Sequence, residues 1–320
     1  MSVLLFVDAN QYLDLFRMNE GRKLLAPLEG QVKHIFITQQ IVDEVYRRKV
    51  KCAGDFLSSS VDKIPASLGA IPDHLLGISD KDLDSWRKRL SDTHDASKKL
   101  RADILKLHAE ALRKISKSQD AVSKRLESLF KKAVTPTDDE LKRARERKER
   151  GNPPGKHNNP LGDQLTWEQL LTACKMCGCE RLWVVSNDDD YSYKMSNEVF
   201  INAFLHKDLR RVCGDTLEVY CFRDLLSALQ HFEKNSGLKV AKMPSKKEAT
   251  KIREELDALP MIQLTAGTAP YFAGSVFAPN APPFAAIATL QPLPSQFSYF
   301  GPGAAPPTVQ KPDIETHDSE

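Results

Sequence analysis

Short apolar runs that end at a polar residue most constrain what this chain can fold into. Four such runs lie at residues 3–7, 34–37, 182–185 and 217–222. The first is closed by Asp8 and the second by Thr38. Runs of this kind are typical of strands that are buried on both faces, in a parallel sheet whose strands are joined by helices. The sequence therefore predicts a doubly wound α/β fold with a central, mostly parallel sheet.

Helical patterns separate these runs, as a parallel sheet requires. Apolar residues recur at helical spacing in two segments, at Leu165, Leu170, Leu171 and Cys174, and then at Val199, Phe200, Ala203 and Phe204. Both segments are expected to be crossover helices that pack on the sheet.

A longer helical segment is inserted after the second predicted strand. Its apolar residues keep spacings near multiples of three and four, at Leu83, Trp86, Leu90, Leu100, Ile104, Leu107, Ala111, Ile115, Val122, Leu126 and Leu129. This pattern predicts one long helix or a helical hairpin, which forms an arm within residues 80–150. A further helix is expected after Thr135-Pro136, because acidic residues fill its first turn and basic residues its last.

The expected domain organisation follows from these patterns. We expect an α/β domain at residues 1–235, a linker and short helix at 236–259, and a disordered Pro- and Ala-rich tail at 260–320. Because the chain has no run of about 18 apolar residues, we expect neither a membrane span nor a signal peptide. Six unevenly spaced cysteines indicate a reducing compartment, and hence a cytoplasmic location.

Acidic residues lie where several predicted strands end or helices begin. They are Asp8 after the first strand, Glu44 in the helix after the second, Asp163 at the start of a later helix, and Asp188, Asp189 and Asp190 after the third strand. Because ligands bind outside the carboxyl ends of parallel strands, we expect these side chains to converge at one sheet edge. Each position also has a structural alternative. Asp8 and Asp163 suit helix N-caps, Glu44 suits an exposed helix position where Asp43 competes with it, and the last group suits a surface turn.

A cluster of carboxylates at one sheet edge implies a bound cation. Carboxylates within about 4–6 Å of each other raise one another's pKa and destabilise the fold unless a positive charge neutralises them. Ligation by oxygen alone favours Mg²⁺ or Mn²⁺ over zinc. Such ions activate a water molecule and stabilise the leaving oxygen in phosphodiester hydrolysis, without a covalent nucleophile.

The order of these motifs resembles that of the PIN nuclease domain. It consists of a strand followed by Asp8, a helix with Glu44, Gly162-Asp163 at a helix start, and a strand followed by Ser186-Asn187-Asp188. Two blocks are similar to those of a bacterial PIN-like subgroup with a helical insertion, the loop Arg150-Gly151-Asn152-Pro153-Pro154-Gly155-Lys156 and the helix start Gly162-Asp163-Gln164-Leu165-Thr166-Trp167. The resemblance covers about residues 1–232, but His157 and Asn158 stand where the subgroup continues with an acid after the loop lysine.

The resemblance implies a three-layer PIN-like fold and a nuclease that depends on Mg²⁺ or Mn²⁺. The expected substrate is RNA rather than DNA, and the expected role is that of a toxin or a defence effector. Catalysis and metal binding are then assigned to Asp8, Glu44, Asp163 and Asp188, with Asp190 as a further metal ligand. Substrate or water is expected to contact Ser186, Asn187, Arg147, Arg150 and Lys156.

Basic residues precede the loop. Residues 81–150 carry 21 Lys/Arg against 13 Asp/Glu, so the rest of the chain is net acidic. The five cations nearest the loop form a predicted basic rim, which consists of Arg143, Arg145, Arg147, Lys148 and Arg150. We expect the rim to guide a nucleic-acid backbone to the acids by nonspecific phosphate contacts. The alternative is a solvated helix face without a ligand.

Other interpretations stay open. One is a catalytically silent PIN-like module that binds nucleic acid, or binds a partner or inhibitory protein through the arm or the tail, with a homodimer as a further option. Another is a nucleotide-binding α/β domain, but no Gly-rich phosphate loop follows the first strand. Cys174, Cys177 and Cys179 are expected to pack rather than bind zinc, and Trp167 is expected to lie in the core rather than stack on bases.

Overall fold

The computed structural model describes residues 2–65, 80–155 and 161–259. All of them belong to one compact unit, Met1–Thr268. The tail expected at residues 260–320 lies outside the described residues, and so does the part of the loop that contains Lys156 and His157. No helix in the described segments has the length and apolar character needed to cross a membrane.

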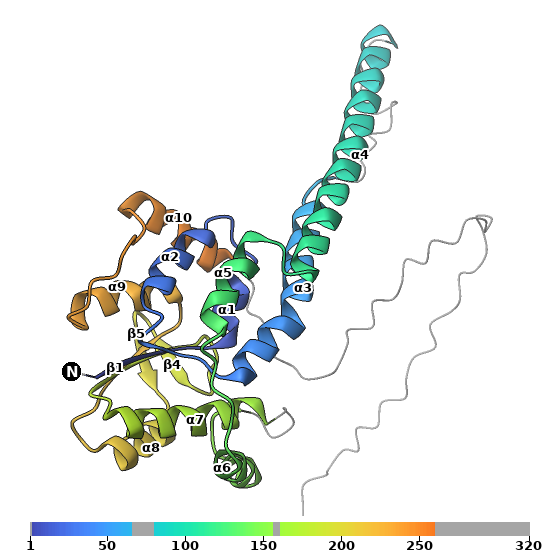
Figure 1. Ribbon diagram of the computed structural model, residues 1–320. Coiled ribbons are helices and arrows are strands. Elements are labelled where there is room, and N and C mark those ends of the chain that lie inside the picture. Colours follow the sequence, from blue (N-terminus) through green and yellow to red (C-terminus); the bar gives the residue numbers. More distant parts are fainter. Residues whose placement is uncertain (1, 66–79, 156–160, 260–320) are drawn as a thin grey trace, which may run out of the picture. The chain divides into compact units, whose positions relative to one another are not determined.

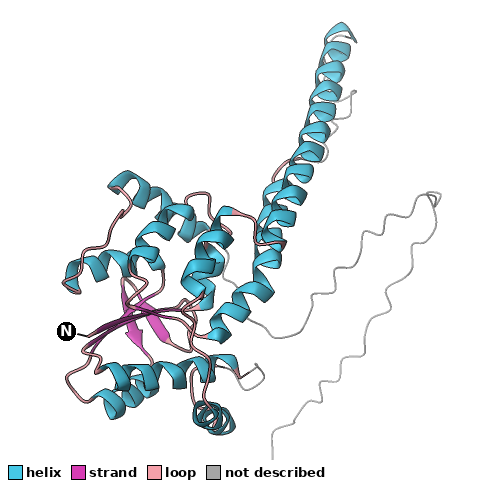
Figure 2. Ribbon diagram, in the orientation of Figure 1, coloured by secondary structure: helices cyan, strands magenta, loops and turns pink. Residues whose placement is uncertain are grey.

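A four-stranded parallel sheet lies at the centre of the molecule (Figure 2). Its strands are β2 (Ile35–Phe36), β1 (Val3–Val7), β3 (Arg181–Val185) and β6 (Glu218–Phe222), in that spatial order. All neighbouring pairs are parallel, and Val7 pairs with Val185, which in turn pairs with Phe222. The fold class and the four predicted strands are therefore confirmed, and the strands β1, β3 and β6 end level with one another.

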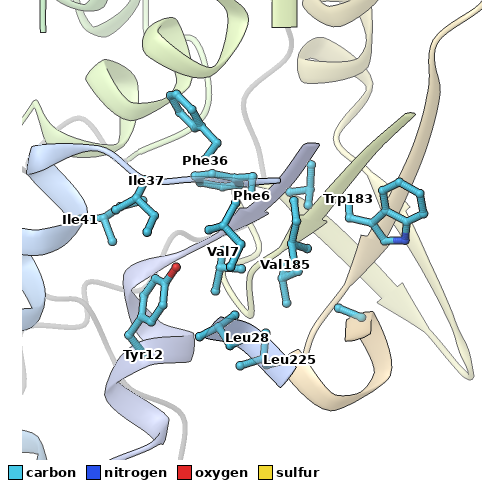
Figure 3. Close-up of a cluster of buried hydrophobic side chains, with 14 of the residues drawn as sticks. Phe6, Val7, Tyr12, Leu28, Phe36, Ile37, Ile41, Trp183, Val185 and Leu225 are labelled. Carbon is cyan, nitrogen blue, oxygen red and sulfur yellow. The ribbon is translucent and has the colours of Figure 1, made fainter. Parts of the chain in front are cut away.

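Helices cover both faces of this sheet (Figure 1). On one face lie α2 (Arg22–Gly30) and α9 (Leu225–Asn235), and on the other lie α7 (Gly162–Cys177) and α8 (Ala203–Cys213). The central strands are consequently buried on both sides, and Phe6, Val7, Trp183 and Val185 lie in the core that Figure 3 shows. This double coverage explains why β1 and residues 182–185 of β3 are continuously apolar.

The predicted insertion is helical. The helix α3 (Gln39–Asp62) packs against α4 (Asp80–Ser116), since the Arg101 side chain donates to Val61 O at 2.9 Å and to Ile64 O at 3.1 Å. A shorter helix, α5 (Ala121–Phe130), follows. Then α6 (Asp138–Glu149) begins at a capping box formed by Thr137 and Glu140, with three acidic residues in its first turn. The helix expected after Thr135-Pro136 is thus confirmed.

A hairpin replaces part of a predicted helix. Strands β4 (Ser192–Met195) and β5 (Glu198–Ile201) pair antiparallel and are joined by Ser196 and Asn197. The expectation that Val199 and Phe200 lie in a helix is wrong, because both belong to β5, and only Ala203 and Phe204 begin α8.

Two further helices complete the described unit. Helix α1 (Ala9–Asp14) follows β1 directly, and its residues are buried. Helix α10 (Lys246–Ala258) packs on the core through Ala249 and Ile252. A salt bridge of 2.8 Å between Lys23 and Glu248 adds a polar contact to this packing.

Candidate active site

The carboxyl ends of the parallel strands lie level at one edge of the sheet, and the residues just after them stay hydrogen-bonded to the neighbouring strand. Asp8 N donates to Val185 O at 2.9 Å, and Ser186 N donates to Phe222 O at 3.0 Å. The ladder therefore continues one residue beyond the strands on each side. As a result, Asp8 and Ser186 are fixed next to each other by backbone hydrogen bonds before any side-chain contact is made.

Asp8 is a buried acid with both oxygens engaged. Its Oδ1 accepts a hydrogen bond from Ala9 N at 2.7 Å, which caps helix α1. Its Oδ2 accepts from Ser186 Oγ at 2.8 Å and from Asn10 Nδ2 at 3.3 Å. The N-cap alternative is therefore correct for one oxygen of Asp8, while the other oxygen faces the loop after β3.

The loop after β3 is organised by hydrogen bonds that backbone amides donate to side-chain oxygens. Ser186 Oγ accepts from Asp188 N at 3.1 Å, and Asp188 Oδ1 accepts from Asp190 N at 3.1 Å. Gly155 N donates to Asp190 Oδ2 at 3.2 Å, so the loop before α7 meets this acid as well. Ser186 is buried and its hydroxyl is bonded to Asp8. The expected contact of Ser186 with substrate therefore does not fit the geometry, and its role is to position Asp8. Asn187 is partly exposed in the same loop.

Glu44, rather than its neighbour Asp43, is the acid of α3 that faces the loop after β3. Asp43 is exposed and accepts a hydrogen bond from Gln39 Nε2 at 2.7 Å. Glu44 lies one position further along α3, at the border of the buried face, and pairs with Arg48 at 3.4 Å. Burial raises the pKa of Glu44, the nearby arginines lower it, and Asp188 raises it again. Glu44 therefore interacts electrostatically with the loop after β3.

Asp163 interacts electrostatically with acids from each of the other segments at this edge of the sheet. It lies in the first turn of α7, whose N-cap is Leu161 and has no side-chain cap, so Asp163 is not the N-cap residue. Burial raises its pKa well above the usual value, and so does repulsion from four other carboxylates, Asp8, Glu44, Asp188 and Asp190. Five acids from four separate segments therefore influence one another. We call this set the acidic cluster.

Repulsion within the acidic cluster also changes the protonation of Asp8. Its pKa rises from 3.8 to about 7, first because the carboxyl is buried and then because Glu44 is close, while the hydrogen bond from Ser186 opposes the rise. Negative charge of this density in a partly desolvated site destabilises the fold unless a cation balances it. The cluster therefore has the electrostatics of a cation-binding site.

Tyr191 lies beside these acids and was not predicted from the sequence. Its ring is buried, 5.7 Å from the ring of Phe6 and 6.0 Å from that of Trp167. Burial and the charges of the acidic cluster raise the pKa of its hydroxyl, so it stays protonated as a potential hydrogen-bond donor. Trp167 is fully buried, as expected for a core residue.

Arg147 is committed to a buried ion-pair network. Its side chain is only 5% exposed and lies between Glu168 and Asp208, at 2.7 and 2.5 Å. Its Nη1 donates to Pro153 O at 2.6 Å. The expected contact of Arg147 with substrate does not fit this geometry, because its donors already face protein acceptors. Arg147 instead joins α6 to α7 and α8.

Of the other residues of the predicted basic rim, one forms an ion pair within the protein and two are exposed to solvent. Arg143 pairs with Glu168 at 2.9 Å, although 45% of its side chain is exposed. Arg145 and Arg150 are exposed on α6 and at its end. Beyond the cluster, Arg223 forms an ion pair with Asp189, whose side chain is mostly exposed. Asp189 therefore has a partner outside the cluster, unlike Asp188.

The donor set of the acidic cluster fits a hard divalent cation. Its side chains offer oxygen alone, as Mg²⁺ and Mn²⁺ prefer. Two buried polar atoms without hydrogen-bond partners, Asn10 Oδ1 and Tyr12 Oη, belong to residues that face Asp8. Within residues 2–65, 80–155 and 161–259, however, no three His, Cys, Asp or Glu side chains form a ready-made metal-binding group.

A comparison with known protein families shows which family this arrangement of acids belongs to. A family model described as PIN domain matches residues 5–191, more than half of the 320-residue chain. The matched region contains all five acids of the acidic cluster. No curated protein and no solved structure matches the chain. The match does not distinguish subgroups, so the resemblance to a bacterial subgroup with specific loop motifs stays a prediction. The chain belongs to the PIN domain family.

Proposed function

We propose that this chain is a nuclease that hydrolyses phosphodiester bonds with the help of Mg²⁺ or Mn²⁺, and that RNA is its preferred substrate. PIN domains are generally metal-dependent nucleases, which gives the proposal its class of reaction. The single observation that carries it is the convergence of acids from four segments, where burial and the neighbouring carboxylates raise the pKa of Asp8, Glu44 and Asp163. Such repulsion is relieved by a divalent cation.

The residues of the acidic cluster take different roles in this proposal. Asp8, Glu44, Asp163 and Asp188 would hold the metal, with Asp190 as a further ligand. Ser186 fixes the Oδ2 of Asp8, and Gly155 N fixes the carboxylate of Asp190. The bound ion supplies an activated water and stabilises the leaving oxygen. Arg150, which is exposed where α6 ends, would contact a substrate phosphate.

A nuclease assay with matched variants tests this assignment. Purified chain is incubated with single-stranded RNA and DNA in Mg²⁺, Mn²⁺ or EDTA. We expect Asp163→Asn and Asp188→Asn to lower cleavage by at least about 100-fold, since each removes a negative ligand from the cluster. Asp43→Asn and Asp189→Asn are the controls, because they change neighbouring acids that face solvent or Arg223.

The outcome separates the proposal from its alternative. Cleavage that needs a divalent ion and is lost only in the first pair of variants supports a nuclease. Cleavage that survives Asp163→Asn would overturn the assignment of the site. A chain that binds RNA without cutting it under any condition is instead the catalytically silent module. A cytoplasmic location and a toxin or defence role stay predictions from composition and resemblance.

A further inference from the structure

The β4–β5 hairpin has an exposed aromatic face. Tyr193 and Phe200 lie directly opposite each other in the antiparallel register of the two strands. Because side chains alternate along a strand, Tyr193, Met195 and Phe200 share one face of the hairpin. These three side chains are 67%, 64% and 50% exposed. A contiguous exposed apolar surface of this kind marks an interaction site.

The hairpin is fixed at its base to the acidic cluster. Tyr191 N donates to Asp188 O at 3.3 Å, and Asn202 N donates to Tyr191 O at 2.9 Å. Both ends of the hairpin are thereby held by Tyr191, which is buried beside the acids. Tyr193 lies three positions after Asp190 in the sequence, which is at most about 10 Å of extended chain. One bound strand can therefore contact both the acidic cluster and the aromatic face.

The proximity of the aromatic face to the acidic cluster favours a nucleic-acid strand as its ligand. Lys194 is exposed on β4, but its side chain lies on the face of the hairpin opposite to the aromatic face, whereas Glu198, which pairs with Met195, lies on the aromatic face. At the base, Arg223 pairs with Asp189 and donates to Ser192 O at 3.5 Å, so the negative charge of Asp189 is balanced. Proteins that bind single strands combine cations for the backbone with aromatic rings on which bases stack. The hairpin supplies the two rings on one face, and Lys194 supplies a cation on the other.

We propose that the β4–β5 hairpin is a base-stacking platform that selects single-stranded nucleic acid, with Tyr193 and Phe200 as the stacking residues. The inference rests on the proposed nuclease function, because the platform would hold the strand whose phosphate lies at the acidic cluster. Bases within a duplex are already stacked on each other, so only unpaired bases can occupy the two rings. The platform would thus select the substrate class, while hydrolysis would take place at the acidic cluster.

Binding in EDTA tests the platform separately from cleavage. Full-length wild type, a Tyr193→Leu/Phe200→Leu double variant and a Tyr193→Phe variant are titrated by fluorescence anisotropy with an RNA oligonucleotide. The same titration uses oligonucleotides with abasic spacers at successive positions, which keep the phosphates and remove bases. Met176→Ala, at another exposed residue (83%), is the control, and thermal unfolding verifies that every variant is folded.

The expected result is a loss that depends on the bases. The double variant should bind the intact strand about tenfold or more weakly, and Tyr193→Phe should bind like wild type. An abasic spacer at the stacked positions should weaken wild type but not the double variant. Equal losses on intact and abasic strands, or no loss, would overturn the platform. So would a change from dimer to monomer with unchanged RNA binding, since the face would then join two copies of this chain. A wild type that binds RNA through the hairpin but never cuts it contradicts the nuclease proposal alone.

Discussion

Asp8 combines burial, a helix cap and three carboxylate neighbours in one residue. Its pKa in the folded, metal-free chain is about 7, against 3.8 in an unperturbed chain. Between these two pH values the folded chain keeps a proton that the unfolded chain has released. The contribution of Asp8 to stability is therefore fully present below about pH 4 and is lost as the pH rises towards 7, by about 1.4 kcal/mol per pH unit.

This shift predicts how metal and pH act together on stability. In EDTA, we expect the free energy of unfolding to fall more steeply between pH 5 and pH 8 in wild type than in Asp8→Asn, which has no carboxyl to titrate. Added Mn²⁺ or Mg²⁺ should raise the melting temperature of wild type more at pH 8 than at pH 5, since the ligands must be deprotonated. Urea unfolding and thermal melting measure these effects. A metal-induced shift of the same size at both pH values would contradict the coupling.

The positions of the acids could be predicted from sequence, but their contacts could not. Asp8 follows its apolar run directly and Asp188 follows its run after two residues, so parallel pairing alone puts both near one edge. The resemblance to the PIN domain implied that Ser186 contacts substrate or water. Its hydroxyl is instead taken by Asp8, a contact between residues 178 positions apart that no local pattern encodes. The burial of a side chain, which the sequence does not show, is therefore needed to tell a residue that positions the site from one that can face a ligand.

At the scale of elements, Arg147 connects three helices that the sequence shows only as separate patterns. It lies on α6, its guanidinium meets Glu168 on α7, and it also meets Asp208 on α8. All three side chains are buried. In the sequence, Arg147 looks like any other cation of a basic helix end, so its partners could not be predicted.

Removing this arginine tests the network. Arg147→Met leaves two buried carboxylates without their shared counter-ion, so we expect the free energy of unfolding to fall by about 3–5 kcal/mol. Arg145→Ala, on the same helix but exposed, should change it by less than about 0.5 kcal/mol. Chemical denaturation at pH 7 measures both values. Equal stability of the two variants would show that Arg147 is no more structural than its neighbours.

The strands were predicted more reliably than the hairpin for a physical reason. Strands β1 and β3 are buried on both faces, so their apolar runs are unmistakable. The hairpin is solvated, and its turn is Ser196-Asn197 rather than a glycine pair, which removes the strongest hairpin signal. The strict alternation in Tyr191-Ser192-Tyr193-Lys194-Met195-Ser196 was the available signal, since alternation of this kind predicts a half-buried strand.

At the scale of the whole molecule, the question is where the folded unit ends. A domain boundary near residue 235 is a prediction from composition. Beyond it, Val240 and Ile252 are buried in the core, and Glu20 N donates to Glu255 on α10 at 3.1 Å. The described core thus includes side chains from both sides of residue 235.

Two truncations test this boundary. A chain that ends at residue 259 keeps every buried residue of the described core, so we expect its free energy of unfolding to match that of the full chain. A chain that ends at residue 239 loses Val240 and α10, including the fully buried Ile252. Because burial of one such side chain contributes about 1.5–3 kcal/mol, the second truncation should be less stable by at least roughly 3 kcal/mol. Urea unfolding of the full chain and the two truncations at one pH measures these differences in the free energy of unfolding. If the shorter chain unfolds at the same urea concentration as the longer one, α10 is an appendage and the folded domain ends before it.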